Sequence, residues 1–229
     1  MTSISTTIAL DNDRPPGRAA GIALLVCAAL TLALLANHPS GAAATFADRL
    51  REEAANSGRD ALVHGGFIAV LAIQFACLAI MTLRLGLARP LAIAGFVLTA
   101  IGAGFLMASM LLDGLVTPAV ASRYLGVVDV AERQNDAKAL FVVLGATISF
   151  LMPAGLLLQA AGLACWCGVF VRDRGLVRVT GIYGAVAAAA VIVAIAATGA
   201  MVPHLLIAAL LLVAGAYALI GAALLRRQL

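Results

Sequence analysis

The sequence predicts an all-α fold, a polytopic membrane helix bundle with about six transmembrane helices. Of the 229 residues, 63% are hydrophobic and 11% are charged, whereas a typical soluble domain is about 45–50% apolar and about 25% charged. Six apolar runs are long enough to cross a bilayer, which takes about 20 residues in a helix. The predicted spans are 18–36, 62–85, 90–112, 139–171, 177–198 and 204–225. Together they make one transmembrane domain over residues 18–229.

The chain before the first span is polar and contains the helix-breaking run Pro15-Pro16-Gly17. Residues 1–17 have too few apolar side chains to fold alone, and we expect a disordered cytoplasmic tail. The first span should end before His38-Pro39, because a proline disfavours helical geometry in the residue before it. Cleavage of this span as a signal peptide stays open, since Ala42-Ala43-Ala44 supplies the small residues of a cleavage site.

Two charged segments interrupt the first half of the chain. Thr45, with Asp48 three residues later, predicts a helix start, and the mixed apolar and charged residues up to Asp60 predict a short amphipathic helix on the outer surface. The third span loses its apolar run at Asp113-Gly114. Residues 117–136 mix charges with valines, which predicts a second surface helix or an ordered loop.

The uncharged run 139–171 is longer than a single crossing requires. As one helix it would be roughly 50 Å long, while the hydrocarbon core is about 30 Å thick. We expect a kink near Pro153, because proline interrupts the helical hydrogen bonds. Thr147, Ser149 and Gln159 flank this position, and polar groups in lipid need partners. The central helix is therefore predicted to lie inside the bundle.

Charge asymmetry predicts the orientation. One side of the six-span arrangement carries nine arginines and three aspartates, and the other carries six basic and eight acidic residues. Because cytoplasmic loops are enriched in basic residues, both termini should be cytoplasmic, as in a multi-pass protein of the inner (plasma) membrane. The basic residues lie at helix ends and not in one patch, so the net charge of +4 does not point to nucleic acid.

Small residues recur at four-residue spacing and predict close helix packing. They are Ala100, Gly104, Ala108, Ala214, Ala218 and Ala222. Trp166, near the end of the central run, is expected to anchor the helix at the membrane interface. Its neighbours Cys165 and Cys167 are two residues apart, so on a helix they face different directions and cannot form a local disulfide or chelate.

Five polar residues are predicted to lie at the outer ends of the spans and form a candidate outer-face polar cluster: His38, His64, Asp113, Arg123 and His204. Imidazole and carboxylate groups at one depth can bind a divalent metal, and two imidazoles can ligate haem iron. The alternative is that they are ordinary residues of the headgroup region. Asp113 is the strongest candidate for marking a site, because a carboxylate beside lipid needs water or a partner.

Two glutamines, Gln74 and Gln159, are predicted at mid-membrane depth. Such side chains either line a substrate path or hydrogen bond between helices. The sequence contains no phosphate-binding loop, nucleophile elbow, HExxH motif or buried acidic proton relay. No catalytic residues are therefore predicted.

Two stretches carry a resemblance to a known family. They are the small-residue segment Gly41-Ala42-Ala43-Ala44-Thr45-Phe46-Ala47 and the segment Arg174-Gly175-Leu176-Val177-Arg178-Val179-Thr180-Gly181 at the start of the fifth span. With the layout of the spans, they make the chain similar to a family of bacterial integral membrane proteins described only as a domain of unknown function. The resemblance implies a bacterial inner membrane and no known activity.

These observations favour a non-enzymatic membrane protein that binds a small apolar molecule or a partner helix beside the central helix, without a cofactor. Two alternatives stay open. The first is a metal- or haem-dependent membrane enzyme or electron carrier that uses the outer histidines, and the second is a small-molecule transporter. The expected surroundings are a lipid bilayer, with a homo-oligomer or a partner membrane protein left open.

Overall fold

A computed structural model describes residues 15–39, 43–125, 131–198, 203–226 and 228–229, and these residues form helices without any strand. The elements in order are α1 (Pro15–Ala36), α2 (Phe46–Leu85), α3 (Pro90–Leu111), the π-helix η1 (Leu112–Val116), α4 (Thr117–Leu125), α5 (Ala131–Phe170), α6 (Gly175–Thr198) and α7 (Pro203–Leu225). Six helical columns are long and apolar enough to cross a membrane, because α3, η1 and α4 form one continuous column. The predicted all-α bundle with six spans is confirmed.

The outer segments differ from the prediction. Thr45 caps a helix start as expected, accepting a hydrogen bond from the Asp48 amide, but the helix then continues to Leu85 as a single α2 of 40 residues. No proline or helix-ending signal separates Asp60 from Leu62, so the surface helix and the second span are one element. Residues 1–14 of the predicted tail lie outside the described residues, and Pro15–Gly17 belong to α1.

The third and fourth spans also extend further than predicted. The third column does not stop at Asp113 but passes through η1 into α4, and α5 begins at Ala131, well before residue 139. α5 stays one helix through Pro153. A 40-residue helix is about 60 Å long, roughly twice the thickness of the hydrocarbon core. These columns therefore project beyond the membrane at one end.

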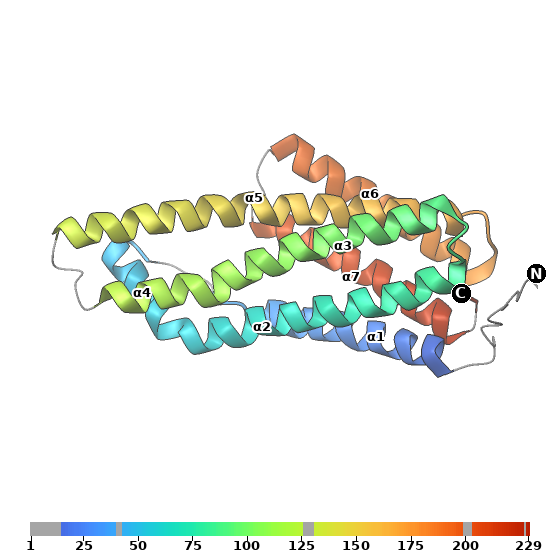
Figure 1. The fold of residues 1–229 in the computed structure, drawn as a ribbon, viewed down its shortest axis with the longest axis horizontal. Helices are drawn as coiled ribbons and strands as arrows, with labels where there is room; N and C mark the ends of the chain where they lie inside the picture. Colours follow the sequence, from blue (N-terminus) through green and yellow to red (C-terminus); the bar gives the residue numbers. More distant parts are fainter. Residues whose placement is uncertain (1–14, 40–42, 126–130, 199–202, 227) are drawn as a thin grey trace, which may run out of the picture.

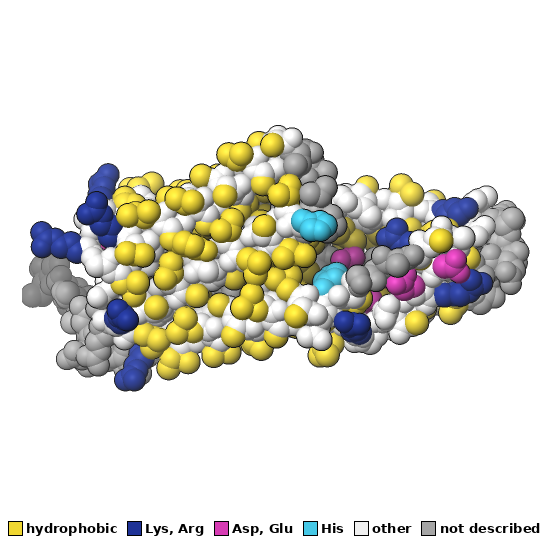
Figure 2. Space-filling model, turned by 180° about the vertical axis from the view of Figure 1, so that it is seen from behind, with side chains coloured by type: hydrophobic (Ala, Val, Ile, Leu, Met, Phe, Trp, Pro, Cys, Tyr) yellow, Lys and Arg dark blue, Asp and Glu magenta, His cyan; other side chains and the backbone are white. Residues whose placement is uncertain are grey.

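The projecting end has a small core of its own, formed by Leu50 of α2, Ala121 of α4 and Phe141 of α5. The rings of Phe46 and Phe141 meet edge to face, with centroids 5.5 Å apart. Figure 1 shows the start of α1 and the end of α7 at the opposite end of the bundle. Figure 2 shows hydrophobic side chains over the wide part, histidines where the wide part meets the narrow projecting end, and acidic side chains along that end. Sidedness in the membrane stays a prediction.

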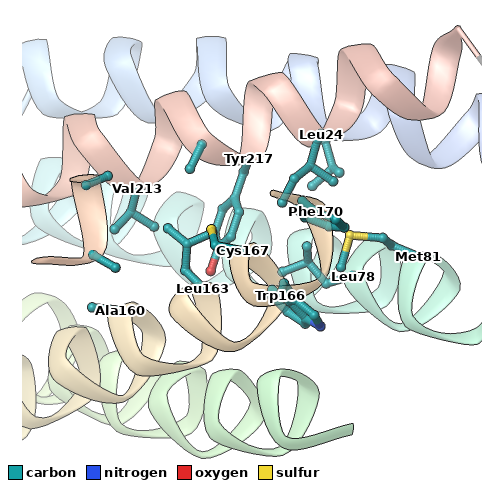
Figure 3. Close-up of a cluster of buried hydrophobic side chains, with 14 of the residues drawn as sticks. Leu24, Leu78, Met81, Ala160, Leu163, Trp166, Cys167, Phe170, Val213 and Tyr217 are labelled. Atoms are coloured by element: carbon teal, nitrogen blue, oxygen red, sulfur yellow. The ribbon is translucent and has the colours of Figure 1, made fainter. Parts of the chain in front are cut away.

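α3 and α5 pack through a seam of small residues. A Cβ at Gly95 or Gly162 would approach backbone of the facing helix within 3 Å, so both positions require glycine. Trp166 is completely buried beside this seam, and its Nε1–H donates to the carbonyl oxygen of Ala92 at 3.1 Å (Figure 3). The interfacial anchor predicted for Trp166 is therefore wrong. Close helix packing was also predicted at Gly104 from the spacing of small residues. It is not found there, because an added Cβ would meet nothing within 4 Å.

The prediction that the central helix lies inside the bundle holds for the second half of α5, where Ala160, Leu163 and Trp166 are completely buried, but the first half faces outward. In the most apolar 18-residue stretch of this span, 17% of the residues are buried, compared with 28–39% in the corresponding stretches of the other five spans. Thr147 is exposed, and its hydroxyl donates to the carbonyl oxygen of Val143 in the same helix at 2.8 Å. This hydrogen bond satisfies the hydroxyl without a partner helix. Of the three polar residues near Pro153, only Gln159 is buried.

Candidate metal centre

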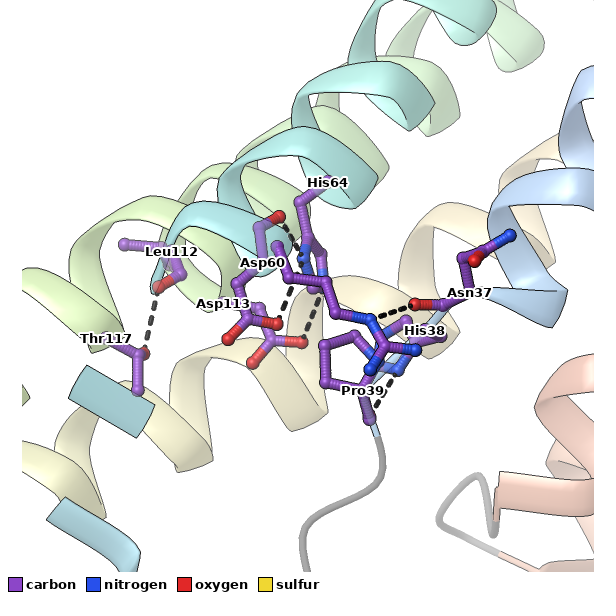
Figure 4. Close-up of polar contacts among 9 residues, drawn as sticks. Asn37, His38, Pro39, Asp60, His64, Leu112, Asp113 and Thr117 are labelled. Atoms are coloured by element: carbon purple, nitrogen blue, oxygen red, sulfur yellow. Dashed lines mark hydrogen bonds and ion pairs between the residues drawn. The ribbon is translucent and has the colours of Figure 1, made fainter. Parts of the chain in front are cut away.

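Three of the predicted cluster residues meet where α1 ends and the longer columns continue. His38 lies two residues beyond α1, His64 lies in the middle of α2, and Asp113 lies in η1. Their potential ligand atoms all lie within 4.8 Å of one another (Figure 4). The side chain of His64 is almost completely buried, that of Asp113 is 38% exposed, and His38 is exposed. The group is therefore open to solvent on one side only.

His64 and Asp113 form the closest pair. The distance from His64 Nε2 to Asp113 Oδ2 is 3.2 Å, and the rings of His38 and His64 meet edge to face with centroids 5.0 Å apart. A carboxylate oxygen only accepts hydrogen bonds. The contact is therefore favourable only if a proton or a cation lies between the two atoms.

Backbone carbonyls fix the tautomers of both histidines. His64 Nδ1 lies 3.0 Å from the carbonyl oxygen of Asp60, and His38 Nδ1 lies 2.8 Å from that of Pro39. Because a carbonyl only accepts, Nδ1 carries the proton of each neutral ring, and each Nε2 keeps its lone pair. This is the usual arrangement of metal-ligating histidines, which donate their other N–H to a carbonyl or carboxylate.

The π-helix places Asp113 against α2. In η1 the helix is wider than an α-helix, a local change that often occurs at functional sites, and the Thr117 hydroxyl donates to the carbonyl oxygen of Leu112 at 2.9 Å. Gly114 lets the two helices approach, because an added Cβ would lie 2.2 Å from the Cβ of His64. Glycine is therefore required beside the histidine.

A cavity of about 80 Å³ adjoins the group. Its walls are His38, Pro39, Glu52, Glu53, Asn56, Asp60, His64 and Asp113. Since a water molecule occupies about 30 Å³ of liquid, the cavity has room for an ion with two or so waters. Arg59 links the end of α1 to α2 by donating from Nε to the carbonyl oxygen of Asn37 at 3.0 Å. This link holds the residue before His38 close to α2.

The other predicted cluster residues do not join this group. Arg123 is exposed, and within the described part of the chain it forms no ion pair with Asp113. His204, also exposed, lies in the first turn of α7 and is not part of the metal-ligating group. The partner of Asp113 is therefore His64.

Gln74 and Gln159 line a second, separate cavity of about 30 Å³ inside the bundle. They are 5% and 3% exposed, and neither side chain forms a hydrogen bond with the described residues. The cavity is large enough for a water molecule, which could supply the missing partner. The interhelical hydrogen bonds considered for them are not found in the described structure.

Four polar residues of the cavity wall were not among the predicted site residues: Glu52, Glu53, Asn56 and Asp60. Glu53, Asn56, Asp60 and His64 recur at intervals of three and four along α2, which places them on one helix face. This spacing is visible in the sequence. It was missed because the segment up to Asp60 was treated as a separate helix.

A double-mutant cycle tests the pairing of Asp113. We expect Asp113→Asn and His64→Gln to be coupled by about 0.5–3 kcal/mol, because residues in contact are not independent. The cycle of Asp113→Asn with Arg123→Gln should be additive within about 0.5 kcal/mol. The measurement is unfolding in detergent with a chelator present. Additivity in the first cycle would show that the two side chains do not interact.

Comparisons of the chain with protein-family models, curated proteins and solved structures find no match. The resemblance noted in the sequence is therefore not supported by a family model. The description of the protein therefore depends on its own residues. It is a bundle of six apolar helical columns, each able to span a membrane, with two imidazoles and a carboxylate together at the base of its projecting end.

Proposed function

We propose that the protein binds a divalent transition-metal ion through His38, His64 and Asp113. The observation that carries this proposal is the convergence of three donor atoms within 4.8 Å, from three elements far apart in sequence. Both histidines direct Nδ1–H to a carbonyl, which leaves Nε2 for the ion. A bound ion would supply the positive charge that makes the contact between His64 Nε2 and Asp113 Oδ2 favourable, in place of a proton on Nε2.

The donor set favours zinc or ferrous iron. Two imidazoles, one carboxylate and an open position form the pattern of catalytic zinc sites, and of the facial triad of non-haem iron enzymes. Two ligands about 2.1 Å from one ion at the tetrahedral angle lie about 3.4 Å apart, close to the 3.2 Å between His64 and Asp113. The set as a whole spans up to 4.8 Å, about 1.4 Å more than this spacing, and a movement of the exposed His38 toward the other two ligands would close it.

The volume argues against haem at this site. Cavities that hold drug-sized ligands measure about 300–1,000 Å³, and a porphyrin is at least that large, whereas this cavity measures about 80 Å³. The acidic wall instead suits a hydrated cation, because carboxylates at Glu53 and Asp60 add negative charge beside the open position. The metal-dependent alternative is thereby favoured over the haem-dependent one.

Titration of the purified protein with Zn²⁺ tests the proposal. After treatment with a chelator, we expect the protein in detergent to bind one ion per chain and to unfold at a higher temperature with the ion than without it, because a ligand of the native state stabilises it. Calorimetry gives the stoichiometry and thermal unfolding gives the shift. Absence of both effects with Zn²⁺ and Fe²⁺ would exclude the site.

A second candidate is binding of a partner helix along the outward half of α5. Phe150 is 71% exposed and Val142 is 70% exposed on this helix, which is the least covered of the six spans. Cysteine at position 150 should then cross-link to a partner or a second copy in native membranes, while cysteine at the lipid-facing Val186 of α6, 64% exposed, serves as the control. Equal cross-linking from both positions would indicate random collision.

A further inference from the structure

We infer that the opposite end of the bundle holds a binding site for the phosphate of an anionic phospholipid. A cavity of about 570 Å³ lies there, between the turn that joins α2 to α3 and the turn that joins α5 to α6. Its walls are Ala88, Arg89, Pro90, Leu91, Gly168, Val169, Arg172 and Asp173. This is the end at which α1 begins and α7 ends (Figure 1).

Two exposed arginines line this cavity from different segments of the chain. Arg89 is the residue before α3, and Arg172 follows α5 by two positions. Within the described part of the chain, neither side chain takes part in an ion pair or a side-chain hydrogen bond. A guanidinium offers several N–H donors in a planar fork that matches phosphate oxygens. The two arginine side chains therefore offer positive charge and N–H donors that no acceptor among the described residues uses.

The single acidic residue in the wall leaves the cavity cationic. Asp173 Oδ1 accepts the backbone N–H of Arg174 at 2.9 Å, so part of its acceptor capacity is used within the turn. The first turn of α3, at Pro90 and Leu91, adds the positive end of a helix dipole to the same wall. Two arginines, one aspartate and the helix dipole together leave the wall with a net positive charge, which favours a singly charged anion such as a phosphodiester.

The position and shape identify a lipid as the source of the phosphate. The cavity opens where the apolar spans end, which is headgroup depth, and basic pockets between transmembrane helices bind anionic headgroups. Its lower wall is apolar, with Leu91 and Val169, as acyl chains require. A volume of about 570 Å³ lies within the usual range of ligand pockets. Gly168 lets this wall pack closely against the start of α3, because an added Cβ would press on Leu91 Cδ1 at 3.2 Å.

Native mass spectrometry of the full chain, titrated with phosphatidylglycerol or phosphatidylcholine, tests the inference. We expect the wild type to retain one phosphatidylglycerol with at least about tenfold preference, and the variant Arg89→Gln/Arg172→Gln to lose that preference. Arg178→Gln is the matched control, since Arg178 is an exposed arginine at the same end that does not line the cavity.

Each remaining outcome decides the question. Equal losses in Arg178→Gln and in the double variant would mean a general attraction to the basic end and would overturn the site. Displacement of the lipid by millimolar inorganic phosphate would mean that a free phosphate compound is the natural ligand, and would overturn the lipid assignment. Retention unchanged in the double variant would exclude both sources. None of these results depends on the metal site at the other end.

Discussion

Replacing His64 with alanine is expected to abolish metal binding, with at least about a 100-fold rise in the dissociation constant for Zn²⁺. Loss of a group that only orients a ligand already costs about 10–100-fold, and His64 is the buried central ligand of the proposed set, 3.2 Å from Asp113. The measurement is calorimetric titration of the variant in the detergent used for the wild type.

His204→Ala is the matched control for this experiment. His204 is an exposed histidine at a helix start that is not part of the ligand group, so its removal should leave the affinity within about twofold of the wild type. If His64→Ala retained wild-type affinity while still folded, the proposed centre would be wrong. If both variants lost binding, the ion would be held by histidines in a different arrangement.

Gly114→Ala is expected to destabilise the protein by about 1–3 kcal/mol, the usual cost of overpacking, and to weaken metal binding at the same time. The new methyl group would lie 2.2 Å from the Cβ of His64. Because a Cβ cannot rotate away from its own backbone, α2 and η1 must separate. That separation moves His64 away from Asp113, and both thermal unfolding and Zn²⁺ titration should register it.

Gly104→Ala on the same helical column gives the comparison. An added Cβ there meets nothing within 4 Å, so this variant should gain up to about 1 kcal/mol from the higher helix propensity of alanine. A similar loss of stability in both variants would mean that glycine matters here through backbone flexibility and not through its contact with His64.

Hydrophobicity predicts the spans well because the bilayer imposes a minimum length of apolar sequence on each crossing. It predicts the ends of the helices poorly, because a helix that leaves the membrane can continue with any polar residues that favour helix. The 40 residues of α2 illustrate this, since its first turns carry Asp48 and Glu52 and its second half is apolar up to Arg84 in the last turn. The six crossings were therefore foreseeable, and the projecting end was not.

The candidate metal centre was predicted only in part. The ends of the predicted spans place His38, His64 and Asp113 at one depth, and the structure does bring these three residues together. Depth alone cannot say which residues in that layer touch. Arg123 was placed beside Asp113 by assuming that the helix ended there, whereas the column continues through η1 and carries Arg123 away on α4.

Similarly, the packing seam could not be read from spacing alone. Gly95, Gly102 and Gly162 lie against facing backbone, while Gly104 is exposed. All of them belong to runs of small residues, and the choice of face depends on which helix lies opposite. That information comes only from the assembled bundle.

The unbroken length of α2 has a mechanical consequence. His64 and Arg84 belong to the same helix, about 30 Å apart along its axis, with no proline between them. A helix of this kind moves as a rod. A tilt of α2 at His64 would therefore also displace Arg84, which lies against the start of α1 at Gly17.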